Sequence, residues 1–130
     1  MVVNFIKKVK DTRLSDFKVK KAVAEIVKQT KYKSKQVEVS VYLVGPAQIK
    51  ELNKKYRNKD KVTDVLSFSF QEGTDLIIGE MGPVYLGEIF ICKQVAEQQA
   101  KEFQHGYEDE FLFLLVHGML HLVGYDHQTK

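Results

Sequence analysis

The fold of this chain depends on residues 110–127, which read E-F-L-F-L-L-V-H-G-M-L-H-L-V-G-Y-D-H. Residues 111–116 are apolar all round, which predicts a buried helix at the centre of the domain. If that helix continues, His117 and His121 are four residues apart and lie one turn apart on the same face. Gly124 then stands where helices commonly end, because glycine readily takes the left-handed conformation that turns the chain.

Three of the chain's four histidines occur in this stretch, in the spacing H-x3-H-x5-H. The turn at Gly124 is expected to bring His127 back toward His117 and His121. Three neutral imidazoles with an open fourth position are typical of a catalytic zinc site rather than a closed structural one. The sequence therefore predicts one metal ion per chain, zinc or another divalent metal such as nickel, held by His117, His121 and His127.

The residue after the first histidine limits the chemistry of this site. The spacing H-x3-H-x2-G-x2-H also occurs in a large class of zinc peptidases, which place a glutamate there as the general base. In this chain the residue is Gly118. The ligands are present and the peptidase base is missing, so we expect a metal site with a different chemistry.

The charge of the chain is distributed unevenly along the sequence. The net charge is +3, but residues 1–61 hold 17 basic and 6 acidic residues, whereas residues 62–130 hold 3 basic and 11 acidic residues. A basic half beside a metal site suggests an anionic substrate. The alternative, that the lysines only solvate helix faces, is left open by charge alone.

Length and cysteine content set the broad class of the protein. A chain of 130 residues predicts a single domain, residues 1–130. The one cysteine, Cys92, excludes an intrachain disulfide and fits a reducing cytosol. No apolar run approaches about 20 residues, and the N-terminus lacks the apolar run of a signal peptide. We therefore expect a cytoplasmic protein without a membrane span.

Hydrophobic periodicity predicts the remaining elements. We expect strands at 2–6, 37–43, 65–70 and 85–92, and helices at 15–30, 46–57, 93–104 and from about 108 onward. Residues 71–83 contain three glycines and a proline, which predicts a long loop or a short hairpin. The order β-α-β-α-β-β-α-α predicts an α+β fold, with one mixed sheet of about four strands and helices packed on it.

The predicted elements also indicate where individual side chains should lie. Ser15 is the expected N-cap of the first helix. Tyr56 and Phe103 are expected on the buried stripes of the second and third helices. His105 is expected to be an exposed helix-end residue, and Cys92 a buried strand thiol rather than a nucleophile.

A second informative stretch is residues 56–68, Y-R-N-K-D-K-V-T-D-V-L-S-F. Arg57, at a helix end beside a basic loop, could hold a phosphate by paired hydrogen bonds. Thr63 and Asp64 could brace the loop through bonds between side chain and backbone. The alternative is a surface arginine and an ordinary turn, and these residues alone do not decide between the two.

Residues 117–127, together with N-K-K-Y-R-N-K-D-K-V-T-D-V-L-S-F (53–68) and L-G-E-I-F-I-C (86–92), resemble the YbeY family of rRNA maturation factors. The resemblance covers essentially the whole chain in order. It implies a bacterial, cytoplasmic, metal-dependent endoribonuclease that cuts single-stranded RNA in 16S rRNA 3′-end maturation and ribosome quality control. It also implies zinc bound by His117, His121 and His127, and places Arg57 on the family's functional arginine.

The sequence departs from the family pattern at three places. Glu88 stands where the family more often has aspartate, and Ser69 stands where proline is common. The sequence ends three residues after His127, whereas many relatives continue into a further helix. The sequence therefore does not decide what closes the cleft behind the metal.

On this reading Arg57, His117 and His121 are the catalytic residues, and Arg57, Lys59 and Lys61 bind the RNA precursor, with the small ribosomal subunit as partner. Arg57 would stabilise charge on the phosphoryl group, and the basic half would attract the RNA backbone. Whether water or the RNA 2′-OH attacks is open.

Asp126 is a candidate proton acceptor or a partner of a ligand histidine, and the alternative is that it only braces the turn. Two other functions remain. One is a metal-dependent hydrolase of peptides or small molecules, and the other is a ribosome assembly factor with a structural zinc.

Overall fold

The structure, a computed structural model, describes residues 1–33, 35–70 and 83–124. In chain order the elements are β1 (Val2–Lys7), α1 (Asp16–Val27), β2 (Val37–Val44), α2 (Pro46–Arg57), β3 (Val65–Ser69), β4 (Val84–Cys92), α3 (Lys93–Glu102) and α4 (Tyr107–Leu122). The predicted order of strands and helices is confirmed. The loop or hairpin expected at 71–83 lies almost wholly outside the described residues.

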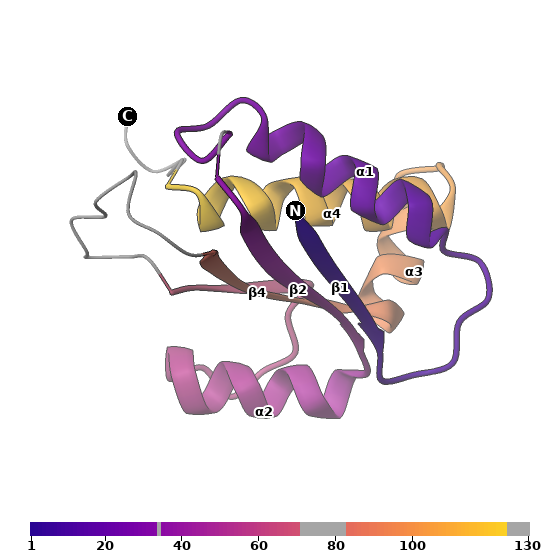
Figure 1. The fold of residues 1–130 in the computed structure, drawn as a ribbon. Coiled ribbons are helices and arrows are strands. Elements are labelled where there is room, and N and C mark those ends of the chain that lie inside the picture. Colours follow the sequence, from indigo (N-terminus) through magenta and orange to yellow (C-terminus); the bar gives the residue numbers. More distant parts are fainter. Residues whose placement is uncertain (34, 71–82, 125–130) are drawn as a thin grey trace.

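The four strands form one mixed sheet in the order β1-β2-β4-β3. β1, β2 and β4 run parallel, and β3 pairs antiparallel with β4. Figure 1 shows α1 and α4 on one face of this sheet and α2 on the opposite face. The predicted α+β fold is therefore confirmed, and the sheet is covered on both faces.

The helix α4 packs on the sheet through one face. Its buried apolar residues are Phe111, Leu114, Leu115, Met119 and Leu122, at the three- and four-residue spacing of a single helical stripe. Phe113, on the same helix, is 63% exposed. The expectation that residues 111–116 would be buried all round is thus wrong, because the sheet and α1 cover α4 from one side and leave its outer side at the surface.

Two further side chains expected in the core are at the surface. Tyr56 is 53% exposed, because Ile49 and Asn53 occupy the buried positions of α2 and only one edge of the tyrosine ring meets Phe68, 5.4 Å away between ring centroids. Phe103 is 63% exposed, because α3 ends at Glu102 and Phe103 is already its C-cap.

The first helix begins as predicted and ends early. The side chain of Ser15 accepts a hydrogen bond from the Lys18 amide at 3.1 Å, which confirms the N-cap. The helix was expected to reach residue 30, but it ends at Val27. There the amide and the hydroxyl of Thr30 both donate to the Val27 carbonyl, and this tighter turn replaces the helical pattern.

Gly87 allows β3, β4 and α4 to meet. Tyr85 pairs with Glu38 and Gly87 pairs with the next residue of β2, so Leu86 is an extra residue, a β-bulge. Gly87 has φ +147°, and a Cβ there would lie 2.1 Å from the carbonyl oxygen of Phe68. Only glycine fits at this crossing.

We predict that Gly87→Ala lowers the free energy of unfolding by about 3 kcal/mol or more, because the added methyl group overlaps the backbone of β3. Urea unfolding of the two proteins measures the difference. Gly45→Ala is the matched control, since its Cβ would come no closer than 3.5 Å to Val9, and it should change stability by only about 0.5 kcal/mol. Equal losses in the two variants would contradict the steric explanation.

Candidate functional site

The helix α4 presents two of the predicted metal ligands one turn apart. The rings of His117 and His121 have centroids 4.8 Å apart and planes inclined at 63°. Two imidazoles that share a tetrahedral zinc, at about 2.0–2.1 Å from each nitrogen, would hold their ring centres roughly 5 Å apart. The spacing of this pair therefore fits one bound zinc ion.

The helix also ends where the sequence predicted. Leu122 is its last residue, and Gly124 takes the left-handed region with φ +98°. His127 and Asp126 lie outside the described residues, so the return of the third histidine stays a prediction. Within residues 1–33, 35–70 and 83–124, no three His, Cys, Asp or Glu side chains gather as a metal site.

A pocket of about 220 Å³ joins these histidines to the end of α2. Its lining residues are Arg57, Asp64, Val65, Leu66, Ser67, His117, Gly118 and His121. The residues of β3 lie between the arginine and the histidine helix. The fold thus brings Arg57 to His117 and His121, which follow it by 60 and 64 positions in the sequence.

Arg57 is held against the edge strand of the sheet. Its Nη2 donates a hydrogen bond to the carbonyl oxygen of Ser67 at 2.7 Å. Its guanidinium carbon lies 4.7 Å from the centroid of the Phe68 ring, a cation–π contact. The next residue, Asn58, is left-handed with φ 59°, which ends α2 directly after the arginine. The guanidinium is therefore positioned by β3 rather than hanging free in solvent.

The basic loop after α2 is fixed by a buried amide. Asn53 is 3% exposed, and its Nδ2 donates to the Lys61 carbonyl at 3.0 Å. Its own carbonyl accepts from the Lys59 amide at 3.2 Å. Lys59 and Lys61 are exposed, and neither is among the described residues that line the pocket. Asn53 was not among the residues predicted to matter, although its place four residues after Ile49 is on the buried stripe of α2.

Asp64 braces the start of β3, as the sequence suggested. Its Oδ1 accepts from the Val65 amide at 2.7 Å and from the Thr63 hydroxyl at 3.4 Å. Its Oδ2 accepts from Nε2 of Gln99 in α3 at 3.4 Å. That Asp64 also lines the pocket was not expected, because no local pattern shows which side of the chain faces α4.

Gly118 lies where α4 packs against the sheet. A Cβ at this position would lie 3.0 Å from Cγ2 of Ile89 and 3.3 Å from Cγ2 of Val65. A glutamate, the general base of the peptidases with this histidine spacing, would need both of these side chains to shift. The structure therefore gives a packing reason for the missing base.

Comparison with known proteins identifies the family. The family model described as Endoribonuclease YbeY matches residues 4–130. This chain belongs to the YbeY family. The proteins named Endoribonuclease YbeY from Staphylococcus carnosus (strain TM300) and Staphylococcus aureus (strain JH9) are similar to it, 50% identical over 93 residues and 44% identical over 108 residues.

These matches cover 72% and 82% of this chain, but only 61% and 70% of the two relatives. The solution structure of TM1509 from Thermotoga maritima is similar to this YbeY-family fold, with a TM-score of 0.63 and 36% identity. That match covers 99% of this chain and 77% of the Thermotoga protein. Among the described helices, none has the length and apolar character needed to cross a membrane.

Two groups outside the pocket are where the sequence placed them. His105 is exposed, and its Nε2 lies 2.6 Å from Oε1 of Glu110, a carboxylate that is itself 1% exposed. Cys92 is fully buried at the end of β4, and burial raises the pKa of its thiol. A buried, protonated thiol is a poor nucleophile, which agrees with its expected structural role.

We predict that Gly118→Glu in this YbeY-family chain creates no peptidase and lowers the free energy of unfolding by about 3 kcal/mol or more. The reason is that the new carboxylate would be forced against Ile89 and Val65. Phe113→Glu is the matched control on the same helix, at a position that is 63% exposed, and should cost much less. Chemical unfolding and a peptide-hydrolysis panel test this. A well-folded, peptide-cleaving Gly118→Glu protein would contradict it.

Proposed function

We propose that this chain is a metal-dependent endoribonuclease that cuts single-stranded RNA, with one zinc ion, or another divalent metal such as nickel, held by His117, His121 and His127. The observation on which the proposal rests most is the pocket of about 220 Å³ that Arg57 shares with His117 and His121. Membership of the YbeY family and the name of the curated relatives support it.

The zinc would supply a Lewis acid for a phosphate oxygen and lower the pKa of a bound water. His117 and His121 would hold it from adjacent turns of α4. Arg57 binds the phosphate through guanidinium N–H groups that remain after one donates to Ser67. As negative charge develops on the phosphoryl oxygens, the fixed guanidinium stabilises it.

Lys59 and Lys61 would extend the contact with the RNA. Both side chains are exposed on a loop whose backbone Asn53 fixes beside Arg57. Lysines in such a position attract phosphates regardless of base sequence. They would therefore add affinity for RNA without choosing the bond that is cut.

The cellular role that we propose is 16S rRNA 3′-end maturation and ribosome quality control, in the cytoplasm and together with the small ribosomal subunit. This part rests on the resemblance of residues 53–68, 86–92 and 117–127 to the YbeY family motifs. The basic first half of the chain fits a partner that consists largely of RNA.

Two structural features weigh against the other functions. Gly118 stands in the place of the peptidase base, and a side chain there would press on Ile89 and Val65. A structural zinc has a closed coordination sphere, whereas His117 and His121 line an open pocket. Both features favour a metal that faces a substrate other than a peptide.

His121→Ala should lose both the metal and RNA cleavage, because one of the imidazoles that hold the ion is gone. Elemental analysis of the purified chain and cleavage of a labelled single-stranded RNA measure the two effects. His105→Ala is the control, since this histidine pairs with Glu110 outside the pocket. Loss of metal with cleavage unchanged would instead favour an assembly factor, and would point to a contaminating nuclease.

Arg57→Lys should keep the metal and lower the cleavage rate by about 10²–10³-fold, because lysine keeps the charge but loses the paired N–H donors. Single-turnover cleavage and metal content are measured on the same samples. Lys54→Ala, on the exposed side of α2, is the control and should cut RNA normally. If the Arg57→Lys variant cut RNA at the wild-type rate, the role proposed for the paired N–H donors of the guanidinium would be excluded.

A further inference from the structure

A second hollow, larger than the pocket at the histidines, lies beside the segment that follows β1. It is an open groove of about 800 Å³, lined by Lys7, Lys8, Val9, Lys10, Asp11, Thr12, Arg13 and Lys93. Five of these eight residues are Lys or Arg, and one is acidic. Among the described residues it has no lining residue in common with the pocket of Arg57.

The groove lies at the carboxyl ends of two parallel strands. β1 leads to α1 on one face of the sheet, and β2 leads to α2 on the opposite face, as Figure 1 shows. In open sheets with helices on both faces, ligands bind outside the carboxyl ends of the strands where the connections diverge in this way. The topology thus provides a ligand position that the histidine pocket does not use.

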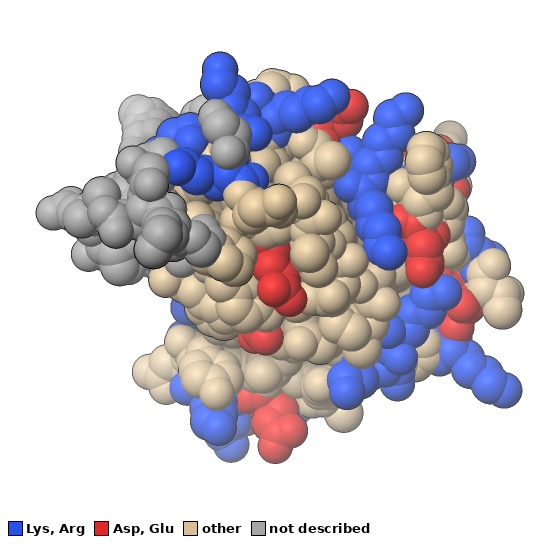
Figure 2. All heavy atoms as spheres, in the orientation of Figure 1, with Lys and Arg blue, Asp and Glu red and all other residues tan. Residues whose placement is uncertain are grey.

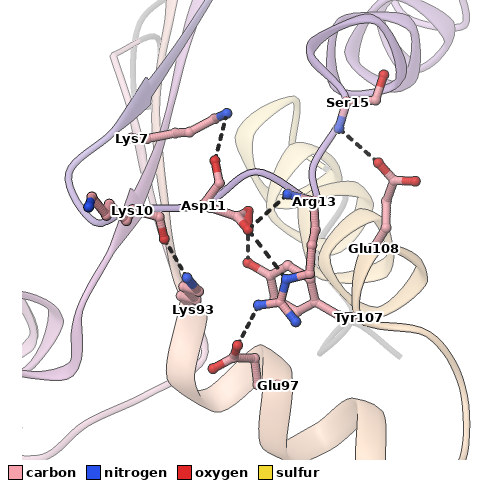
Figure 3. Close-up of polar contacts among 9 residues, drawn as sticks. All are labelled: Lys7, Lys10, Asp11, Arg13, Ser15, Lys93, Glu97, Tyr107 and Glu108. Atoms are coloured by element: carbon pink, nitrogen blue, oxygen red, sulfur yellow. Dashed lines mark hydrogen bonds and ion pairs between the residues drawn. The ribbon is translucent and has the colours of Figure 1, made fainter.

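The one acid of the groove is turned inward and paired. The side chain of Asp11 has 0% exposure. Its carboxylate accepts from the Arg13 amide and from the Tyr107 hydroxyl, each at 3.2 Å, and lies 3.5 Å from Nε of Arg13 (Figure 3). Burial, and then the nearby Asp11 carboxylate, raise the pKa of Tyr107, so the phenol stays protonated and keeps donating. The Asp11 carboxylate is thus taken up by Arg13 and Tyr107, and the four lysines still leave the described lining with a net positive charge.

Two of the groove's ammonium groups are oriented by backbone oxygens. Lys7 Nζ donates to the Asp11 carbonyl at 3.2 Å, and Lys93 Nζ donates to the Lys10 carbonyl (Figure 3). A carbonyl oxygen orients an ammonium group without neutralising it, and each ammonium has three donors. These two cations are thus held in place with their charge available to a ligand.

The segment itself is anchored on the neighbouring helices. The guanidinium of Arg13 lies 3.9 Å from the centroid of the Tyr107 ring and pairs with Glu97 of α3. This pairing satisfies the charge of Arg13, so Arg13 anchors the groove rather than binding a ligand. Figure 3 shows these contacts converging on the segment from α3 and α4.

Lys8 and Lys10 are the cations best placed for a ligand. Both are exposed, and their side chains make no polar contact with another described residue. Figure 2 shows Lys and Arg side chains gathered along the right of the view, over the segment that follows β1. An anionic ligand in the groove would be attracted by both ammonium groups.

We propose that this groove binds the phosphodiester backbone of single-stranded RNA outside the cleavage pocket. The proposal rests on the function proposed above and adds a second RNA contact to it. Val9 is the one apolar side chain among the described residues that line the groove, so the groove offers little to the side chains of an acidic peptide. The regularly spaced phosphates of RNA need only the lysines.

The start of α3 connects the groove to the pocket. Asp64, in the pocket, accepts from the Cys92 amide at 2.9 Å through its carbonyl, and Lys93 of the groove is the next residue. Gln99, farther along α3, contacts the Asp64 carboxylate. A strand of RNA that crosses the start of α3 would therefore reach both sites.

The test compares two variants of equal charge. Lys8→Gln/Lys10→Gln removes two lysines of the groove, and Lys20→Gln/Lys21→Gln removes two exposed lysines of α1. Fluorescence anisotropy with a labelled 20-nucleotide single-stranded RNA gives affinity at several salt concentrations. We expect the groove variant to bind roughly tenfold more weakly at low salt, with the slope of log affinity against log salt flattened by about 1.4. Cleavage of a tetranucleotide should not change.

Each other outcome overturns the proposal. No loss of affinity, or equal loss in the α1 variant, would show that the groove is not an RNA contact. If polyglutamate bound in the groove as tightly as RNA does, the groove would be assigned to an acidic protein partner instead. Thermal unfolding checks that both variants fold.

Binding and cleavage are measured separately, so the two proposals can fail separately. Binding that depends on Lys8 and Lys10, without any cleavage, would retain the groove and refute the nuclease. RNA cleavage with an RNA affinity that does not depend on Lys8 or Lys10 would retain the nuclease and refute the groove.

Discussion

The close approach of α4 to the sheet at Gly118 is the contact on which the site depends. Glycine inside a helix costs about 1 kcal/mol relative to alanine, and here it lets the helix backbone come against Ile89 and Val65. The same approach places His117 and His121 beside β3, so that strand and helix form two sides of one pocket. Farther along, Gly87 has the equivalent function where β3, β4 and Leu122 meet.

The uneven charge of the sequence has a different meaning once the chain is folded. Part of the acidic half is used in internal contacts. Glu97 pairs with Arg13, Glu108 pairs with Lys18 and accepts from the Ser15 amide, and Glu110 pairs with His105. The first two contacts join α3 and α4 to the basic half. The hydrogen bonds from Ser15 and Lys18 lower the pKa of Glu108, so this contact persists into mildly acidic conditions.

Local features of the fold could be predicted from the sequence, because the information is in neighbouring residues. The spacing of His117 and His121, the turn at Gly124 and the cap at Ser15 follow from helix geometry alone. Periodicity says which face of a helix is apolar, but not how far the covering layer extends, and so Phe113 and Tyr56 were placed wrongly. The sheet and α1 do not extend over Phe113. On α2, the buried position expected for Tyr56 is occupied by Asn53.

The candidate site was less predictable than the fold. Residues 56–68 alone did not decide whether Arg57 belongs to it, and only the resemblance to a family placed it there. Its nearness to the histidines depends on how β3 lies between α2 and α4, which no local pattern encodes. The same reason explains why Asp64 was seen as a brace and not as a lining residue. His127 remains a prediction from spacing.

The hydrogen bond from Arg57 to Ser67 has a consequence for assembly. Among the strands that the structure describes, β3 is an outer one, and outer strands present unpaired carbonyl and amide groups to which another chain can add. The guanidinium occupies one of these carbonyls and covers the neighbouring Phe68 ring. A foreign strand must displace this cation before it can pair there, so one side chain both serves the pocket and discourages aggregation along the open edge.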